Sequence, residues 1–334
     1  MNRKTFIVIP AIVLVIILSS SIGVAATPPP AEPTAALLVS GLEEGTTGST
    51  VGPGGDLFVT QGATGSILRV DPRTGEVSTF ASGLPTAIIP GLGGPIDVAF
   101  IGGTAYALVT LVSGPVPGGT DISGIYRIDG PSSYTIIADI GQYSVANPPD
   151  TDFFVPSGVQ YAIETFRGGF LVTDGHHNRV LHVTRDGQIS EMIEFENVVP
   201  TGLEVHGDTV FVSQAGPVPH YPEDGKVVAF RPGSPSATEV ASGARLIVDV
   251  EAGRGRTLYA LSQGVWNGEG EGTPALPNTG ELVQVDGNGG FSVIMDDLDR
   301  PTSMEFIQNS AYIMTMGGEI WQIGVSGPPY GTSN

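Results

Sequence analysis

Cysteine is absent from this chain of 334 residues. Its absence excludes disulfide bonds, a catalytic thiolate, a thiolate metal site and a lipid-modified cysteine. If the protein is exported, the packing of its core alone must therefore hold the fold.

Basic residues are scarce. Lysine and arginine together number 14 against 34 acidic residues, for a formal net charge of −20, and the only lysines are Lys4 and Lys226. Because such a surface repels phosphate backbones, we expect no nucleic-acid partner. The charge suits solubility, cation binding or a salty environment, and a solvated acidic surface is the simplest of these interpretations.

Long apolar runs at helical spacing are also missing after the N-terminus. Glycine (48) and proline (27) make up about a fifth of the chain and are spread along it. Glycine permits positive φ and proline presets φ near −65°, so this distribution predicts many short strands joined by tight turns.

The N-terminus has the features of an export signal. Arg3 and Lys4 precede an apolar run of 13 residues, Phe6 to Leu18, and Val24-Ala25-Ala26 supplies small residues for a cleavage site. The alternative is a retained membrane anchor, but the run is shorter than the roughly 20 residues that span a bilayer. We predict a signal peptide over residues 1–26, cleavage after Ala26, and a secreted protein that has no membrane contact afterwards.

A repeat covers most of the remaining chain. We predict a proline-rich linker over 27–34, a repeat domain over 35–325 and a tail over 326–334. A short apolar strand recurs six times: DLFVT (56–60), TAYALVT (104–110), GFLVT (169–173), TVFVS (209–213), TLYALS (257–262) and AYIMT (311–315). Each copy is followed by another short strand, such as GSILRV (65–70) or NRVLHV (178–183). The six copies indicate six structural units of about 48 residues.

The outer strand of each unit occurs only five times after its partners. A sixth copy, AALLVSG (35–41), precedes the first unit and resembles TEVASG (238–243) near the end of the fourth. These features predict an all-β, six-bladed β-propeller whose N-terminal strand joins the last blade and closes the ring. A plain β-sandwich is the alternative, and the sixfold repeat disfavours it.

Unit lengths differ because long insertions occur at two kinds of connection. They lie between the second and third strands (113–123, 214–225, 263–280) or between one unit and the next (83–95, 141–156). In a blade of four antiparallel strands, both kinds of connection emerge on the same face. Insertions confined to one face are typical of a binding side.

These motifs resemble a known family. LVTDGHHNRVLHVTRDGQIS is similar to an NHL-type propeller repeat. The opening SGL, the unit GPGGDLFVTQGATGSILRVDPRTG, and the strand starts GLGGPIDVAF and TGLEV make residues 35–325 look like the ScyD/ScyE family of secreted bacterial propellers. The resemblance implies an exported propeller and brings no agreed set of catalytic residues.

First-strand residues near the turn face the central channel in propellers. Here these positions include Asp97, Ser157, Thr201, Asp249 and Thr302. Their oxygens, above all those of Asp97 and Asp249, could hold Ca²⁺, a hard cation that prefers oxygen ligands. The alternative is that both aspartates accept hydrogen bonds from backbone N–H groups of the loops.

Related gluconolactonase-type propellers use a Glu, an Asn and an Asp in such a channel for metal-assisted lactone hydrolysis. This sequence departs from that pattern, because the start of its first unit, TTGSTVGP (46–53), contains no Glu.

The insertion 263–280 carries a candidate ligand-binding surface. Trp266 with Glu269 and Glu271 could stack on a sugar or another flat ligand, and His220 with Tyr221 could complete that surface. The alternative is a tryptophan packed over the core edge with solvated glutamates.

His176 and His177, between Asp174 and Asn178, form the densest polar cluster. Adjacent histidines on a turn point in different directions, which disfavours a shared metal. The alternative is that Asp174 and Asn178 bond the turn backbone while the imidazoles lie on the surface.

Three functions remain open from the sequence. The first is a non-catalytic module that binds a small molecule or an extracellular protein on the insertion face. The second is a calcium-dependent, lactonase-like hydrolase or pathway enzyme working in the channel. The third is a purely structural envelope protein.

Overall fold

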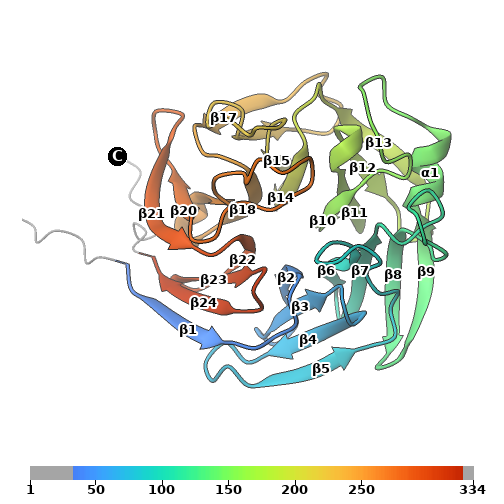
Figure 1. Cartoon of the computed structure of the whole chain (residues 1–334), viewed down its shortest axis with the longest axis horizontal. Coiled ribbons are helices and arrows are strands. Elements are labelled where there is room, and N and C mark those ends of the chain that lie inside the picture. Colours follow the sequence, from blue (N-terminus) through green and yellow to red (C-terminus); the bar gives the residue numbers. More distant parts are fainter. Residues whose placement is uncertain (1–32, 326–334) are drawn as a thin grey trace, which may run out of the picture. The chain divides into compact units, whose positions relative to one another are not determined.

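The structure is a computed structural model that describes residues 33–325. The predicted signal peptide and C-terminal tail, and most of the predicted linker, lie outside the described residues. Within them the chain forms six four-stranded antiparallel sheets around a central axis (Figure 1). This arrangement confirms the predicted all-β, six-bladed propeller.

Each blade is numbered here by its order in the chain. Blade 1 contains β2 (Thr46–Val51), β3 (Leu57–Gln61), β4 (Ser66–Val70) and β5 (Val77–Ala81). Blade 2 contains β6 (Gly94–Ile101), β7 (Thr104–Thr110), β8 (Gly124–Gly130) and β9 (Ser133–Asp139). Blade 3 contains β10 (Gln160–Phe166), β11 (Gly169–Asp174), β12 (Arg179–Val183) and β13 (Ile189–Glu194).

The second half of the ring repeats this plan. Blade 4 contains β14 (Pro200–His206), β15 (Thr209–Gln214), β16 (Lys226–Phe230) and β17 (Thr238–Ser242). Blade 5 contains β18 (Ile247–Ala252), β19 (Leu258–Ser262), β20 (Gly280–Val285) and β21 (Phe291–Leu298). Blade 6 contains β22 (Pro301–Ile307), β23 (Ser310–Thr315) and β24 (Ile320–Gly324), with β1 (Ala35–Val39) as its outer strand.

The pairing of β1 with β24 closes the ring as predicted. The two strands run antiparallel, with Ala35 opposite Ile323 and Leu37 opposite Trp321. Figure 1 shows the blue N-terminal strand lying beside the red last blade. An outer strand taken from the other end of the chain covers an edge of blade 6 that would otherwise be open.

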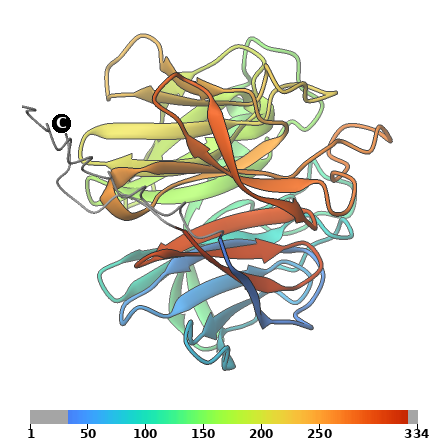
Figure 2. The same cartoon turned by 90° about the vertical axis from the view of Figure 1, so that its left-hand side faces the viewer.

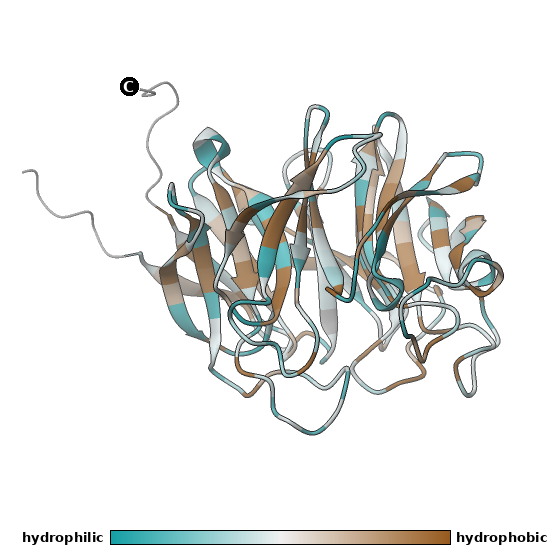
Figure 3. Cartoon of the chain, turned by 90° about the horizontal axis from the view of Figure 1, so that it is seen from above, coloured by the Kyte–Doolittle hydropathy of each residue, from teal (hydrophilic) through white to brown (hydrophobic). Residues whose placement is uncertain are grey.

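The core lies between neighbouring blades. Every residue of β3 and of β11 is buried, because both faces of these second strands pack against adjacent sheets. Leu171 of blade 3, for example, packs in one cluster with Leu203 and Val212 of blade 4. This two-sided burial explains why the second strands are apolar at consecutive positions instead of alternating. Figure 3 shows the apolar residues concentrated in the strands.

The connection between blades 2 and 3 differs from the predicted insertion at 141–156. It begins with a short helix, α1 (Ile140–Ala146), directly after β9, and it extends to residue 159, because β10 begins at Gln160. Asp139 caps α1 by accepting a hydrogen bond from the Gln142 N–H. Seven residues are too few to display helical periodicity, so no pattern in the sequence predicts this helix.

Two 3₁₀ turns complete the secondary structure of the described chain. They are η1 (Gly175–His177) and η2 (Arg254–Arg256). No helix among residues 33–325 has the length and apolar character needed to cross a membrane.

Candidate functional site

Four of the five long insertions, all except 113–123, border a cavity of about 670 Å³ at one end of the central channel. Its lining comes from the first strands of the blades and from connections on the insertion face, including Pro90, Phe154, Val218 and Thr273. The connection between β19 and β20 projects from this side of the ring, to the right in Figure 2. The face that carries the insertions is thus the face on which the cavity opens.

Asp97 and Asp249 line the cavity, and both accept hydrogen bonds from the backbone. The Asp97 carboxylate accepts the N–H of Val98 at 2.8 Å and that of Ile163, in the next blade, at 2.8 Å. Asp249 does the same with Val250 at 2.9 Å and with Met304 at 2.8 Å. The donors belong to first strands, not to loops, so each aspartate joins two neighbouring blades.

Glycines in the preceding blades make room for these aspartates. A Cβ at Gly48 would clash with Asp97, and a Cβ at Gly202 would lie 2.6 Å from Asp249 Oδ1. The glycine–aspartate pair therefore occurs twice, three blades apart, on opposite sides of the ring. The strands need glycine at both positions for close approach rather than for an unusual φ.

Four glutamates, none of them predicted as site residues from the sequence, occupy one level of the channel. In its first strand, each glutamate lies two residues after the position that Asp97 and Asp249 occupy in theirs. Each also pairs across the sheet with an apolar or aromatic residue of the second strand: Glu164 with Leu171, Glu204 with Phe211, Glu251 with Tyr259 and Glu305 with Tyr312. In blades 1 and 2 the same level holds Thr50 and Ala99. Two residues of strand place this level about 7 Å deeper than the aspartates.

A short repeat in the sequence could have revealed these glutamates. Ala-Ile-Glu (162–164), Gly-Leu-Glu (202–204), Asp-Val-Glu (249–251) and Ser-Met-Glu (303–305) share one pattern, a small or acidic residue, an apolar residue and a glutamate. Alternation along a strand puts the first and third residues on one face, so the pattern predicts a ring of carboxyl groups.

The carboxyl groups shift one another's protonation. Burial, together with charges of the neighbouring acids, raises the pKa of Asp249 and that of Glu204 to about 7. Burial and the same repulsion hold the pKa values of Asp97, Glu251 and Glu305 well above their ordinary values. Asp97, Asp249, Glu251 and Glu305 keep some accessible surface, and all four line the cavity. The channel therefore retains protons that exposed carboxyl groups would have lost near neutral pH.

Aromatic side chains form one wall of the cavity, which comprises Phe153, Phe154, Tyr161 and His176. The Phe154 ring is 58% exposed and meets the His176 ring edge to face, with centroids 4.4 Å apart. Burial lowers the pKa of His176 to about 4, so its imidazole is neutral at pH 7. This wall offers flat, uncharged surface beside the acidic floor.

The residues predicted for ligand binding divide into two groups. His220 and Glu271 line the cavity, whereas Trp266, Glu269 and Tyr221 do not. The Trp266 indole N–H donates within its own loop, at 3.1 Å to the Gly270 carbonyl. Trp266 thus holds the loop together and meets the His220 ring at a centroid distance of 6.3 Å.

Glu269 and Tyr221 are exposed to solvent, with 52% of the Tyr221 surface accessible. Of the other predicted channel residues, Thr201 and Thr302 line the cavity and Ser157 does not. The Ser157 hydroxyl is the one buried side-chain oxygen in the described chain without a hydrogen-bond partner.

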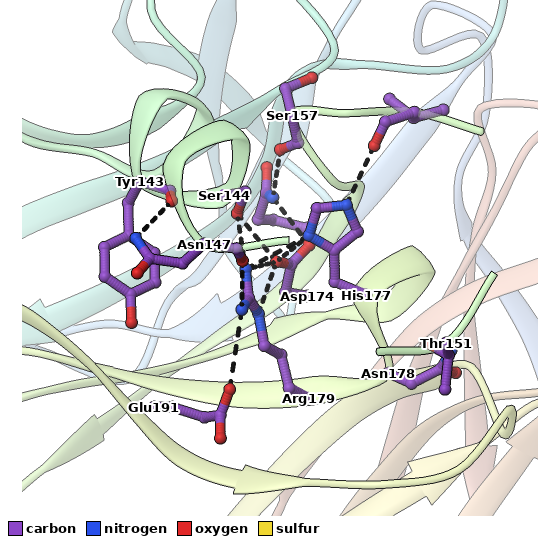
Figure 4. A network of polar contacts seen from close by, with 12 residues as sticks. Tyr143, Ser144, Asn147, Thr151, Ser157, Asp174, His177, Asn178, Arg179 and Glu191 are labelled. Atoms are coloured by element: carbon purple, nitrogen blue, oxygen red, sulfur yellow. Dashed lines mark hydrogen bonds and ion pairs between the residues drawn. The ribbon is translucent and has the colours of Figure 1, made fainter. Parts of the chain in front are cut away.

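The polar cluster at the β11–β12 turn is a buried structural network (Figure 4). The Asp174 carboxylate accepts hydrogen bonds from Ser144 at 2.9 Å, Gln160 at 3.0 Å and Arg179 at 3.1 Å. Burial alone would raise the Asp174 pKa, but the hydrogen bond from His177 and the charges of His177 and Arg179 lower it. The network ties α1 to blade 3.

The expectation that both imidazoles lie on the surface is therefore wrong. His177 is fully buried, and its Nε2 donates to the Val155 carbonyl at 3.1 Å. His176 is half-buried in the cavity wall. Asn178 accepts the N–H groups of Val198 and Val199, so it anchors the next connection. The sequence could not show that α1 covers the turn and supplies its partners.

Metal ligation has little geometric support in the part of the chain that the structure describes. No group of three or more His, Asp or Glu side chains in residues 33–325 is arranged to hold a metal ion. Asp97 and Asp249, the predicted calcium ligands, each use both carboxylate oxygens to accept backbone N–H groups.

Comparison with known proteins places the chain by fold. No protein-family model matches it, and no curated protein matches it in sequence. A gluconolactonase from Xanthomonas campestris superposes with a TM-score of 0.61 at 13% identity, over 87% of this chain and 89% of that one. A virginiamycin B lyase from Staphylococcus aureus gives 0.53 at 14% identity, over 88% and 99%.

A chain of a nidogen/laminin complex gives a TM-score of 0.51 at 14% identity, over 77% of this chain and 84% of that one. The protein is thus a six-bladed propeller that is similar in fold to a gluconolactonase and a lyase. At these identities the likeness shows the fold alone. Since one fold serves a lactonase, a lyase and a protein complex, function must come from the site.

Proposed function

We propose that the protein is an exported, non-catalytic propeller of the ScyD/ScyE type that binds a small ligand in the cavity on its insertion face. The cavity carries this proposal. Its volume of about 670 Å³ falls within the range of small-molecule sites, about 300–1,000 Å³. Its lining also combines apolar and aromatic walls with a few polar groups, as such sites do.

The state of the polar groups favours binding over catalysis. Both aspartates are occupied by backbone N–H groups, and Asp174 lies inside a closed network. The His220 Nδ1 donates to the Ala215 carbonyl at 3.1 Å, while His176 packs against Phe154. Neither imidazole is thus paired with a nucleophile, as a general base would be.

Export and family rest on the sequence. The basic start, the apolar run Phe6 to Leu18 and the small residues before Ala26 support secretion. The unit at 52–75 and the strand starts at 91 and 201 support the ScyD/ScyE resemblance. In a secreted protein this cavity would be open to extracellular solutes.

The absence of cysteine permits a direct test that requires no candidate ligand. A single cysteine would be introduced by Glu271→Cys, at an exposed residue on the cavity rim. The matched control is Asn288→Cys, at an exposed residue of the tight turn between β20 and β21, on the opposite face. Each variant is incubated with a library of disulfide-bearing fragments under increasing reductant, and captured fragments are identified by intact mass.

We expect Glu271→Cys to retain a distinct subset of fragments at reductant concentrations that strip every fragment from Asn288→Cys. Indistinguishable capture at the two cysteines would refute the proposed binding site.

A further inference from the structure

We propose that the ligand of this cavity is a small organic cation, an amine or a guanidine carrying an apolar or aromatic body. The inference rests on the proposed function and specifies the chemistry of that site. It combines two independent features of the cavity, an acidic floor without counter-charges and an exposed aromatic wall.

The floor carries no compensating positive charge. Glu164, Glu251 and Glu305 line it together with the two aspartates, and no lysine or arginine is among the described lining residues. The only basic side chains there are His176 and His220, and burial lowers the pKa of both. A cationic ligand would therefore find several carboxyl groups and no competing cation.

Glu305 is the most open acceptor of this floor. In the described chain no residue donates a hydrogen bond to its carboxyl group, and the charged groups that act on it are all acids: Asp97, Glu164, Glu204, Asp249 and Glu251. Glu164, by contrast, accepts the N–H of Thr165 at 2.8 Å. An ammonium or guanidinium donor would favour the ionised form of Glu305, which then releases its proton to solvent, and would offset the repulsion from the neighbouring acids.

The wall selects for an organic body. Phe153 and Phe154 are 38% and 58% exposed and both line the cavity, so they form a contiguous apolar surface of the kind that marks ligand sites. Leu92, Val199 and Met316 add apolar surface to the same lining. Aromatic faces attract cations and also pack against apolar groups, so floor and wall favour one type of molecule.

A bare metal ion fits the cavity less well. An inorganic cation would make no use of the aromatic wall, and it would need several oxygens converging on one point. The described residues provide no group of three acidic or histidine side chains in such an arrangement.

Calorimetry with three probes of similar shape and different charge tests the inference. The probes are phenethylammonium, 2-phenylethanol and phenylacetate, with CaCl₂ as a separate arm, all titrated into the protein at pH 8. Because hydrogen bonds to charged groups are stronger than neutral ones, we expect phenethylammonium to bind about tenfold or more tightly than the alcohol, and phenylacetate to bind most weakly.

Three substitutions test which residues determine the affinity for each probe. Glu305→Gln should weaken phenethylammonium binding about tenfold and leave 2-phenylethanol binding within about twofold. Phe154→Ala should weaken both probes. Glu76→Gln, an exposed glutamate in the turn between β4 and β5 on the opposite face, is the matched control and should change neither.

Four outcomes overturn the inference. Equal or tighter binding of the alcohol or phenylacetate would show a cavity that binds ligands without selecting a cation. No binding of phenethylammonium at millimolar concentration, or an unchanged affinity in Glu305→Gln, would also refute it. In each case fragment capture at Glu271→Cys still decides the proposed function, so the two failures are distinguishable. Calcium binding that abolishes amine binding would identify the floor as a metal site instead.

Discussion

Replacing Glu204 by glutamine should destabilise the folded protein at acidic pH and stabilise it at alkaline pH. Burial and the charge of Glu164 raise the Glu204 pKa from 4.5 to about 7, while a hydrogen bond to Glu251 opposes the shift. Between these two values the folded protein binds more protons than the unfolded chain. Its free energy of unfolding therefore falls as pH rises through this window.

The size of the effect follows from the shift. A change from 4.5 to about 7 corresponds to about 3 kcal/mol of stability, present at acidic pH and lost above pH 7. Glutamine cannot ionise, but its buried amide gives up part of the hydrogen bond to Glu251, at about 1 kcal/mol. We expect Glu204→Gln to be about 2 kcal/mol more stable than the parent at pH 8 and about 1 kcal/mol less stable at pH 4.5.

Urea unfolding followed by tryptophan fluorescence at several pH values measures both differences. In thermal scans the gain at pH 8 corresponds to a Tm increase of about 3 °C for a chain of this size. Glu76→Gln, on the opposite face, controls for the loss of one negative charge and should change stability by less than about 0.5 kcal/mol at either pH. A Glu204→Gln variant less stable than the parent at pH 8, or one with no crossover, would refute the inferred repulsion in the channel.

Two further substitutions test how the blades are joined. Gly202→Ala places a Cβ 2.6 Å from Asp249 Oδ1 and should lower the free energy of unfolding, measured in urea, by about 1–3 kcal/mol. Gly103→Ala, whose Cβ would meet no atom within 4 Å, should be nearly neutral. Equal effects of the two substitutions would contradict the close-approach argument. Arg179→Met removes the arginine partner of the buried Asp174 carboxylate and should cost about 3–5 kcal/mol, whereas Arg73→Met, at an exposed ion pair, should cost less than about 1 kcal/mol. A loss below 1 kcal/mol for Arg179→Met would show that the buried network contributes little.

The fold was predictable because its signal is repeated. Six copies of the second strand, each apolar at consecutive positions, reflect one physical requirement, burial between two neighbouring sheets. The position of residues 35–41 was equally informative. This outer strand precedes the first blade, and the last blade is the one that lacks an outer strand, so the two are expected to pair. Pattern and topology agree here because each blade packs mainly against its two neighbours.

The site was only partly predictable because it depends on distances across the ring. Asp97 and Asp249 are recognisable as channel residues, but one of the two donors to each comes from the next blade, and no local pattern reveals that donor. The chemistry of Trp266 suggests a stacking surface, yet its indole is used within its own loop. The four channel glutamates are visible in the sequence as a repeated triplet. Aligning the polar positions of the repeats, as well as the apolar ones, would have revealed them.

Ring closure also acts as a check on chain completeness. Ala35 and Ile323 pair across almost the whole described sequence, so β1 is synthesised before its partner β24 and cannot pair until blade 6 has been made. A product that ends early in blade 6 leaves two open strand edges, which invite aggregation and proteolysis. Under the proposed export, only a chain delivered as far as β24 could bury both edges.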